Sequence, residues 1–303
     1  MLQLSHLFLP GFQLAVIILL QLEQLYFQGG AGALCKTEAQ TKETLKHIKQ
    51  AGYDGIELNG FMIRPTPFVV RMLTKFAGMP VGKGGKYNWK ELLSEAGLRT
   101  IAIHEDLGSI QRDPDMIIKE ANEFQTNHIV ITGMYRFDYS DKNAVCKLAA
   151  DLNHSAEELK KSGIRLSYHN HNCEFRKVEP GLTAYELLIR ETDPELVGFE
   201  FDSYWPTEAG VSALDLMKRL GSRMKLYHIT DRGTRITGPS MTPILTSDSV
   251  ELGDGNMNLT ALIKQAKSVN VDAVILETHK NWIDKSPVKS LERSAEYLRQ
   301  CSL

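Results

Sequence analysis

Two patterns of hydrophobic and polar positions alternate along the chain. Short apolar runs predict buried strands, and the segments between them carry apolar residues at helical spacing. The predicted strands are Gly55–Asn59, Arg99–His104, His128–Thr132, Val197–Asp202, Met224–His228 and Ala273–Glu277, with one more opening at Arg165. The predicted helices are Lys36–Ala51, Phe68–Phe76, Trp89–Ala96, one beginning at Asp113, Asp141–Ser162, Thr183–Arg190, Ser212–Leu220, Asn258–Lys267 and Pro287–Arg299. The polar stretch from Arg232 to Gly255, rich in Thr, Ser, Pro and Gly, is predicted to be a loop.

The order of these elements predicts a fold class. Strand and helix alternate seven times, or eight if a first strand lies within residues 14–27. Strands that are apolar on both faces are typical of a parallel sheet covered by helices. Seven or eight such units in about 280 residues predict a single α/β domain, a (β/α)8 TIM barrel. The competing fold is an open doubly wound sheet, but no GxGxxG follows the first strand to support dinucleotide binding.

The N-terminal part of the chain does not fit the repeat. The run from Leu7 to Leu22 is strongly apolar, but no Lys or Arg precedes it and it is short for a membrane span. Part of this run, or Gln21–Phe27, is a candidate for the first strand. We expect an apolar leader over residues 1–20 and a single TIM-barrel domain over residues 21–303. The expected location is the cytoplasm, or outside the cell if residues 1–30 form a signal peptide.

The amino-acid composition argues against several kinds of binding partner and against a cysteine-based site. Acidic and basic residues are interspersed, the net charge is −2, and no basic tract stands out, which argues against nucleic acid. No membrane partner is expected either. The four cysteines lie far apart and form no CxxC pair, so neither a disulfide framework nor a zinc–thiolate site is predicted.

Candidate chemistry is concentrated in the stretch Arg165–Phe175, which reads RLSYHNHNCEF. Successive side chains of a strand point to opposite faces, so His169 and His171 point the same way, and Glu174 follows just past the strand. Two imidazoles and a carboxylate at the carboxyl end of a strand suit a metal site or an acid–base site. The alternative interpretation is an exposed loop with two surface histidines.

Other predicted strands end in the same way. The further polar residues at or near strand ends are Glu57, His104, Asp202, His228 and Glu277. In a barrel all these ends lie on one face, where active sites are built. Burying so many unpaired polar groups would cost several kcal/mol each, so a structural role alone does not explain them. In the strand Val197–Asp202, Glu200 and Asp202 share the face that is expected to point toward the barrel axis.

These residues predict a single metal centre. The predicted ligands are His169, Asp202, His228 and Glu277, with His171 or Glu174 as alternatives to His169. Nitrogen and oxygen donors without a thiolate suit one divalent metal ion (Mn²⁺, Co²⁺, Zn²⁺, Fe²⁺ or Mg²⁺), and donor type does not choose among them. Asp231, three residues after His228, is expected to orient that histidine, with capping of a helix or a loop as the alternative.

Several stretches of the chain occur together in a known family. They are GYDGIEL (52–58), EAGLRTIAIHEDL (95–107), YHNHNCEF (168–175), FDSYWP (201–206), LYHITD (226–231), GDGNMNL (253–259) and LET (276–278). They resemble the sugar phosphate isomerase/epimerase family with its xylose isomerase-like TIM barrel. The resemblance implies one divalent metal at the ends of strands five to eight, and proton shifts next to a carbonyl through an enediolate. The chain departs from the family pattern at Thr230, where the family has Lys, and at Asp254, where it has Glu.

The resemblance implies an isomerase or epimerase that acts on a sugar or keto-sugar. Glu277 would remove the proton next to the carbonyl and Glu174 would return it. The residues expected to bind the substrate are Glu57, His104, His171 and Trp205. The alternative is a metal-dependent lyase or dehydratase acting on a keto-glycoside or keto-inositol.

Two further classes are less well supported. DNA-incising relatives carry a histidine where this chain has Trp205, which disfavours a nuclease. A non-catalytic sugar-binding barrel would need only shape and would bind its ligand without metal. The expected partner is therefore a small-molecule carbohydrate, with a homo-oligomer left open as the assembly.

Overall fold

The computed structural model describes residues 13–17, 37–65, 72, 85–236, 238–278 and 280–301. The chain forms two compact units that interleave along the sequence. Unit 1 comprises Met1–Thr100, Thr230–Thr260 and Ile275–Leu303, and unit 2 comprises Ile101–Ile229 and Ala261–Val274. Each unit is described by itself below.

Five parallel strands form the centre of unit 2. They are β3 (Arg99–Glu105), β4 (His128–Ile131), β5 (Arg165–His169), β8 (Val197–Asp202) and β9 (Met224–Ile229), hydrogen-bonded in that order. The registers include Ile103 with Ile129, Leu166 with Val197, and Asp202 with His228. Nearly every side chain in these strands is buried, which explains why the strands are apolar on both faces.

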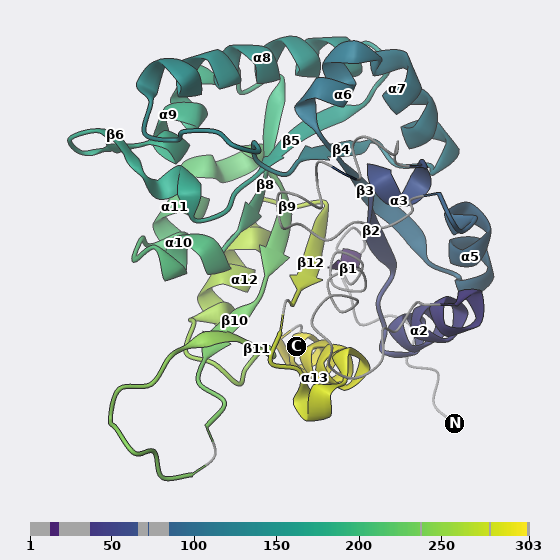
Figure 1. The fold of residues 1–303 in the computed structure, drawn as a ribbon, viewed down its shortest axis with the longest axis vertical. Helices are drawn as coiled ribbons and strands as arrows, with labels where there is room; N and C mark the ends of the chain where they lie inside the picture. The colour runs from purple at the N-terminus through teal and green to yellow at the C-terminus, as the bar shows by residue number, and fades with distance from the viewer. Residues whose placement is uncertain are drawn as a thin grey trace. The chain divides into compact units, whose positions relative to one another are not determined.

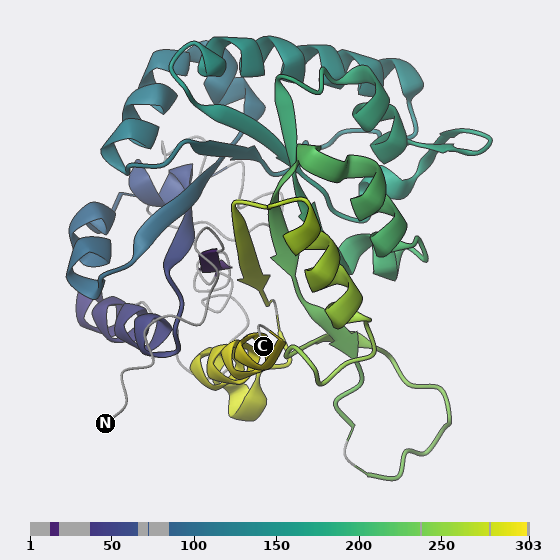
Figure 2. The same ribbon diagram turned by 180° about the vertical axis from the view of Figure 1, so that it is seen from behind.

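Helices lie along the outer side of these strands, as the views from front and back both show (Figures 1 and 2). They are α6 (Leu107–Arg112), α7 (Pro114–Glu123), α8 (Lys142–Lys160), α9 (Ala184–Glu191), α10 (Tyr204–Glu208) and α11 (Ala213–Leu220). Their ends follow from local chemistry: Asp113, where a helix was predicted to begin, caps α7 with Pro114 in its first turn, and Asp141 caps α8. The buried face of α8 carries Val145 and Leu148 at helical spacing.

Unit 1 contains two parallel strands and four helices that each lie wholly within it. These are β1 (Gln13–Ile17), β2 (Gly55–Asn59), α2 (Glu38–Gln50), α3 (Gly60–Ile63), α5 (Trp89–Ala96) and α13 (Pro287–Cys301). Ala15 of β1 pairs with Gly55 of β2. The buried Tyr53 donates its hydroxyl hydrogen to the backbone carbonyl of Leu291 at 3.0 Å, which ties the start of this unit to α13. Three described elements run from one unit into the other along the chain: β3, whose first two residues belong to unit 1, α12 (Leu259–Ser268) and β12 (Ala273–Glu277).

The first strand settles one alternative left open by the sequence. β1 lies within the apolar run from Leu7 to Leu22, which was one of the two candidate segments. The other candidate, Gln21–Phe27, lies outside the described residues, as does the predicted helix Phe68–Phe76 apart from Met72. The division into a leader over residues 1–20 and a domain over residues 21–303 stays a prediction.

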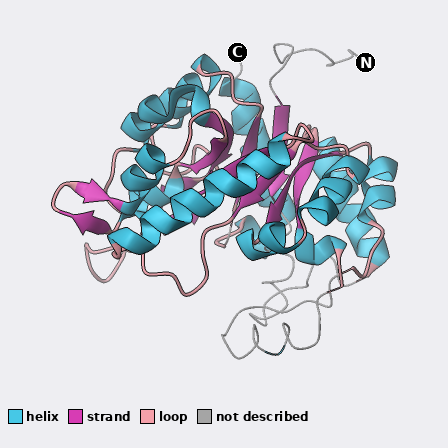
Figure 3. Cartoon of the chain, turned by 90° about the horizontal axis from the view of Figure 1, so that it is seen from above, coloured by secondary structure: helices cyan, strands magenta, loops and turns pink. Residues whose placement is uncertain are grey.

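The predicted loop from Arg232 to Gly255 is wrong in part, because it contains a short antiparallel ribbon. β10 (Asp231–Gly233) pairs with β11 (Asp248–Val250), and the chain between them extends as a long loop (Figure 1). These strands have no apolar alternation, because they are short and are held mainly by backbone hydrogen bonds, so periodicity could not reveal them. A second hairpin was also missed: β6 (Lys177–Glu179) with β7 (Leu182–Thr183), drawn as two short magenta arrows in Figure 3.

The described residues also include three single turns of 3-10 helix: η1 (Cys173–Phe175), η2 (Gly221–Arg223) and η3 (Ile283–Lys285). Among the described helices, none combines the length and the apolar character needed to cross a bilayer.

Candidate metal centre

Three of the four predicted metal ligands come together in unit 2. His169 ends β5, Asp202 ends β8, and His228 lies beside Asp202 in β9 through the parallel register. One ligand atom from each of these side chains lies within 4.8 Å of the others, and all three side chains are buried. Two imidazole nitrogens and a carboxylate oxygen are suitable donors for a divalent transition metal, so the residues present fit such an ion. We call these three residues the first cation site.

Local hydrogen bonds hold Asp202 in place. Its Oδ1 accepts the backbone N–H of Tyr204 at 2.7 Å. The fully buried Asn170, directly after β5, clamps the backbone of Asp202: its amide donates to the Asp202 carbonyl at 3.0 Å, and its side-chain oxygen accepts the Asp202 N–H at 3.1 Å. The ends of β5 and β8 are therefore fixed to each other, which preorganises the ligands.

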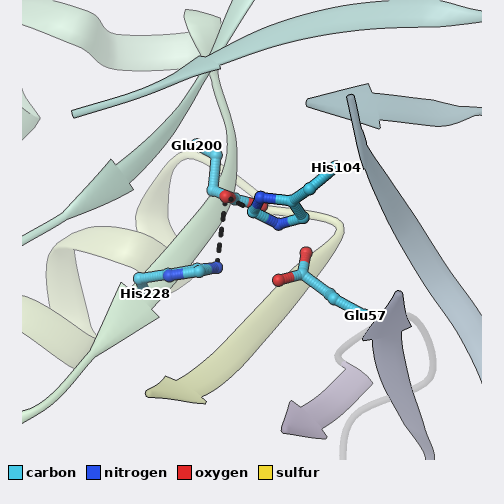
Figure 4. Close-up of side chains that lie close together, drawn as sticks. All are labelled: Glu57, His104, Glu200 and His228. Atoms are coloured by element: carbon cyan, nitrogen blue, oxygen red, sulfur yellow. Dashed lines mark ion pairs between the residues drawn. The ribbon is translucent and has the colours of Figure 1, made fainter. Parts of the chain in front are cut away.

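Glu200 is the central residue that sequence reasoning missed. Its Oε2 lies 3.0 Å from Nδ1 of His169, 3.2 Å from Nε2 of His228 and 3.4 Å from Nε2 of His104. Figure 4 shows the contacts with His228 and His104 as dashed lines. The only signal in the sequence was strand phase, which put Glu200 on the same face as Asp202 but did not show that three histidines surround it.

The ring nitrogen of His104 that faces away from Glu200 contacts Thr132. Its Nδ1 lies 2.6 Å from the hydroxyl oxygen of Thr132, so the ring is held between Thr132 and Glu200. The ring centroids of His104 and His228 are 6.0 Å apart, and those of His169 and His228 are 4.7 Å apart. The imidazoles therefore form one buried cluster within unit 2.

Two of the predicted substrate-binding residues adjoin this cluster. The ring centroid of His171 lies 4.9 Å from that of His169 and 5.6 Å from that of Trp205. His171 and Trp205 are half-buried, whereas His169 is fully buried. The two rings thus form a half-buried extension of the cluster of imidazoles.

Glu174 lies in a different hydrogen-bond network. It is fully buried, and its carboxylate accepts the hydroxyl of Tyr168 at 2.8 Å, the backbone N–H of His171 at 2.9 Å and the thiol of Cys173 at 3.2 Å. Burial, and then the Glu174 carboxylate, raise the pKa of the Cys173 thiol to about 12, so this thiol remains a hydrogen-bond donor. Burial and Glu174 also raise the pKa of Tyr168. These contacts fix the turn after β5 that carries His171.

The remaining predicted residues belong to unit 1. Glu57 is buried within β2, and Glu277 is buried at the end of β12. The hydroxyl of Thr230 donates to the backbone carbonyl of Glu277, so the residue that replaces the family Lys helps to fix the end of β12. Both Glu57 and Glu277 stay predicted site residues.

Asp231 makes the contacts of a loop-capping residue. Its Oδ1 accepts the backbone N–H groups of Arg232 at 2.8 Å and Met257 at 3.1 Å, and its Oδ2 accepts those of Gly253 and Gly255 at 3.0 Å each. Burial raises the pKa of Asp231, and these four hydrogen bonds oppose that shift. The approach is so close that a side chain at Gly255 would collide with the Asp231 carboxylate. The described contacts therefore match the loop-capping alternative, and a role in orienting His228 stays a prediction.

Comparison with known proteins identifies the family. The model of the xylose isomerase-like TIM barrel family matches residues 45–301. The chain belongs to the xylose isomerase-like TIM barrel family. The predicted fold class, a (β/α)8 TIM barrel, and the resemblance to sugar phosphate isomerases/epimerases are confirmed.

Individual relatives of this xylose isomerase-like protein are distant. An inosose dehydratase from Mesomycoplasma hyopneumoniae (strain 7448) is 24% identical, over 84% of this chain and 86% of the relative. The structure of a sugar phosphate isomerase/epimerase from Parabacteroides distasonis ATCC 8503 superimposes with a TM-score of 0.71 at 21% identity, over 96% and 94% of the two chains. The structure of IOLI protein with a bound zinc atom gives a TM-score of 0.57 at 13% identity, over 95% of each chain. These relatives confirm the prediction of an enzyme and leave the class of reaction to the proposal below.

Proposed function

We propose that the protein is a divalent-metal-dependent isomerase or epimerase that moves a proton on the carbon next to the carbonyl of a sugar or keto-sugar. The single observation that carries the proposal is the convergence of His169, Asp202 and His228 in one buried group. A divalent cation held there would polarise the carbonyl of the substrate and stabilise the negative charge that develops when the proton leaves. The family membership of the chain supports the same class of chemistry.

The protein's own residues would supply the proton transfers and the binding. Glu277, at the end of β12, is proposed as the base that removes the proton and as the fourth ligand, because a buried carboxylate at a strand end suits both roles. Glu174 is proposed to return the proton, in the network that also holds His171. Glu57, His171 and Trp205 are proposed to bind the substrate hydroxyls and cover one sugar face, whereas both ring nitrogens of His104 already face Thr132 and Glu200. His171 is supported by its half-buried position next to His169, and Trp205 by its half-buried position next to His171.

A second candidate is a dehydratase acting on a keto-inositol. The observation that favours it is the inosose dehydratase relative, which matches most of both chains. The same site would remove the proton next to the carbonyl and then expel a neighbouring hydroxyl group instead of returning the proton. Both candidates share the first step and differ in the second.

Deuterium uptake distinguishes the two candidates. The metal-loaded enzyme is incubated in deuterium oxide with a panel of ketoses, keto-glycosides and inososes, and each compound is then analysed by mass spectrometry. We expect the enzyme to exchange one carbon-bound hydrogen of its substrate for deuterium. Exchange with the substrate formula otherwise unchanged supports the isomerase or epimerase. Loss of one water supports the dehydratase. If the metal is bound and no compound in the panel shows hydrogen exchange or loss of water, the proposed function is contradicted.

A further inference from the structure

We propose that unit 2 holds a second divalent-cation site, formed by His104, Glu200 and His228 and adjoining the first cation site. One ligand atom from each of these three side chains lies within 4.8 Å of the others, and all are buried. The site takes a borderline transition metal such as Zn²⁺, because two imidazoles and one carboxylate suit such an ion better than Mg²⁺ or Ca²⁺. This inference concerns metal binding and goes beyond the proposed reaction.

The distances around Glu200 are the first argument. A hydrogen bond between a charged donor and a carboxylate is typically about 2.7–2.9 Å long. Nε2 of His228 and Nε2 of His104 instead lie 3.2 Å and 3.4 Å from Oε2 of Glu200. Zinc binds nitrogen and oxygen at about 2.0–2.1 Å with tetrahedral geometry, which separates two ligands by about 3.3 Å. The observed separations match the edge of a metal tetrahedron better than they match hydrogen bonds.

The number of donors around one oxygen is the second argument. A carboxylate oxygen offers two lone pairs, yet three imidazole nitrogens converge on Oε2 of Glu200. The His169 contact, at 3.0 Å, is the shortest and meets hydrogen-bond criteria. If His169 donates its Nδ1 hydrogen to Glu200, the Nε2 atom of that ring serves the first cation site. Nε2 of His104 and of His228 are then assigned to the second cation site together with Oε2.

The surroundings of His104 are the third argument. A ligating histidine commonly donates its other ring N–H to an oxygen, which fixes the tautomer and turns the lone pair toward the metal. His104 has this arrangement, because its Nδ1 lies 2.6 Å from the Thr132 hydroxyl while its Nε2 faces Glu200. Glu200 is fully buried, and a buried carboxylate is normally paired or bound to a cation. His228 belongs to both groups of donors, so it binds both cations at once only as an imidazolate that has released its remaining ring N–H proton.

Metal stoichiometry tests the proposal on the full-length protein. The protein is stripped with a chelator, loaded with Zn²⁺, freed of excess metal, and its zinc content is measured per chain. We expect two zinc ions in the wild type and in the control His154→Gln, because His154 is exposed on α8. We expect one ion in His104→Gln, which removes only the second cation site, and one in Asp202→Asn, which removes only the first.

Three outcomes overturn the proposal, and each is distinct from a failure of the first cation site. The first outcome is a wild-type chain that binds one zinc ion, which Asp202→Asn loses and His104→Gln keeps. That result supports the first cation site and refutes the second. Two ions that persist in His104→Gln refute the assignment of His104. Thr132→Val serves as a second variant in case His104→Gln does not fold: it removes the partner of Nδ1 and should weaken only one of the two zinc affinities, by about 10–100-fold. Unchanged affinities in folded Thr132→Val also count against the proposal.

Discussion

Asp202→Asn is expected to abolish metal binding at the first cation site and, with it, turnover. The asparagine oxygen can still accept the N–H of Tyr204, and the backbone clamp from Asn170 does not involve the Asp202 side chain. The fold should therefore survive, while one negatively charged ligand becomes a neutral amide. Loss of an outer partner of a metal ligand typically costs 10–100-fold in affinity, so loss of the ligand itself should cost more than ~10²-fold.

The measurement is the affinity of the purified variant for Mn²⁺ or Co²⁺, taken together with turnover of the substrate found by deuterium exchange. His154→Gln is the matched control, because it changes a side chain on the exposed face of α8 and should keep both properties. A folded Asp202→Asn protein with wild-type affinity and turnover would remove Asp202 from the site.

Glu277→Gln is expected to lower turnover by about 10²–10⁴-fold, the usual contribution of a general base. Glutamine keeps the shape of the side chain and one oxygen that can approach a cation, but it cannot accept the proton. The Thr230 hydroxyl bonds to the backbone carbonyl at this position, so the end of β12 should stay in place. Exchange of the substrate hydrogen with deuterium oxide should fall by the same factor, because the variant fails at proton removal.

Glu123→Gln, an exposed position on α7, is the matched control for loss of a glutamate. Circular dichroism and metal content show whether Glu277→Gln is folded and loaded. If the loaded variant still exchanges the substrate hydrogen at the wild-type rate, Glu277 is not the base, and the proposed division of roles between Glu277 and Glu174 is wrong.

Much of the fold could be predicted from the sequence because the relevant signals are local. A strand has a side-chain period of two residues, so a polar residue at the end of an apolar run is placed on a definite face. That reasoning predicted the strands ending at Asp202 and Glu277. Local rules also predicted the start of α7 at Asp113 and the end of α5 at Ala96, which is followed by Gly97 in a left-handed conformation with φ of +68°.

The missed features depend on contacts between segments that are distant in the chain. Strand phase placed Glu200 beside Asp202, but only the register of β5, β8 and β9 shows that its carboxylate meets three histidines. The ribbon of β10 and β11 is held by backbone pairing, and the Asp231 carboxylate fixes the chain that follows β11; neither leaves an apolar pattern. The candidate site was therefore predictable as a set of residues, whereas the central position of Glu200 was not.

The most direct test of the metal centre is anomalous diffraction from a crystal soaked in Mn²⁺. We predict an anomalous peak bounded by His169, Asp202 and His228, at coordination distance from one atom of each side chain. No peak at that position, with the three side chains still grouped and with Mn²⁺ in excess, would contradict the metal centre on which the proposed function depends.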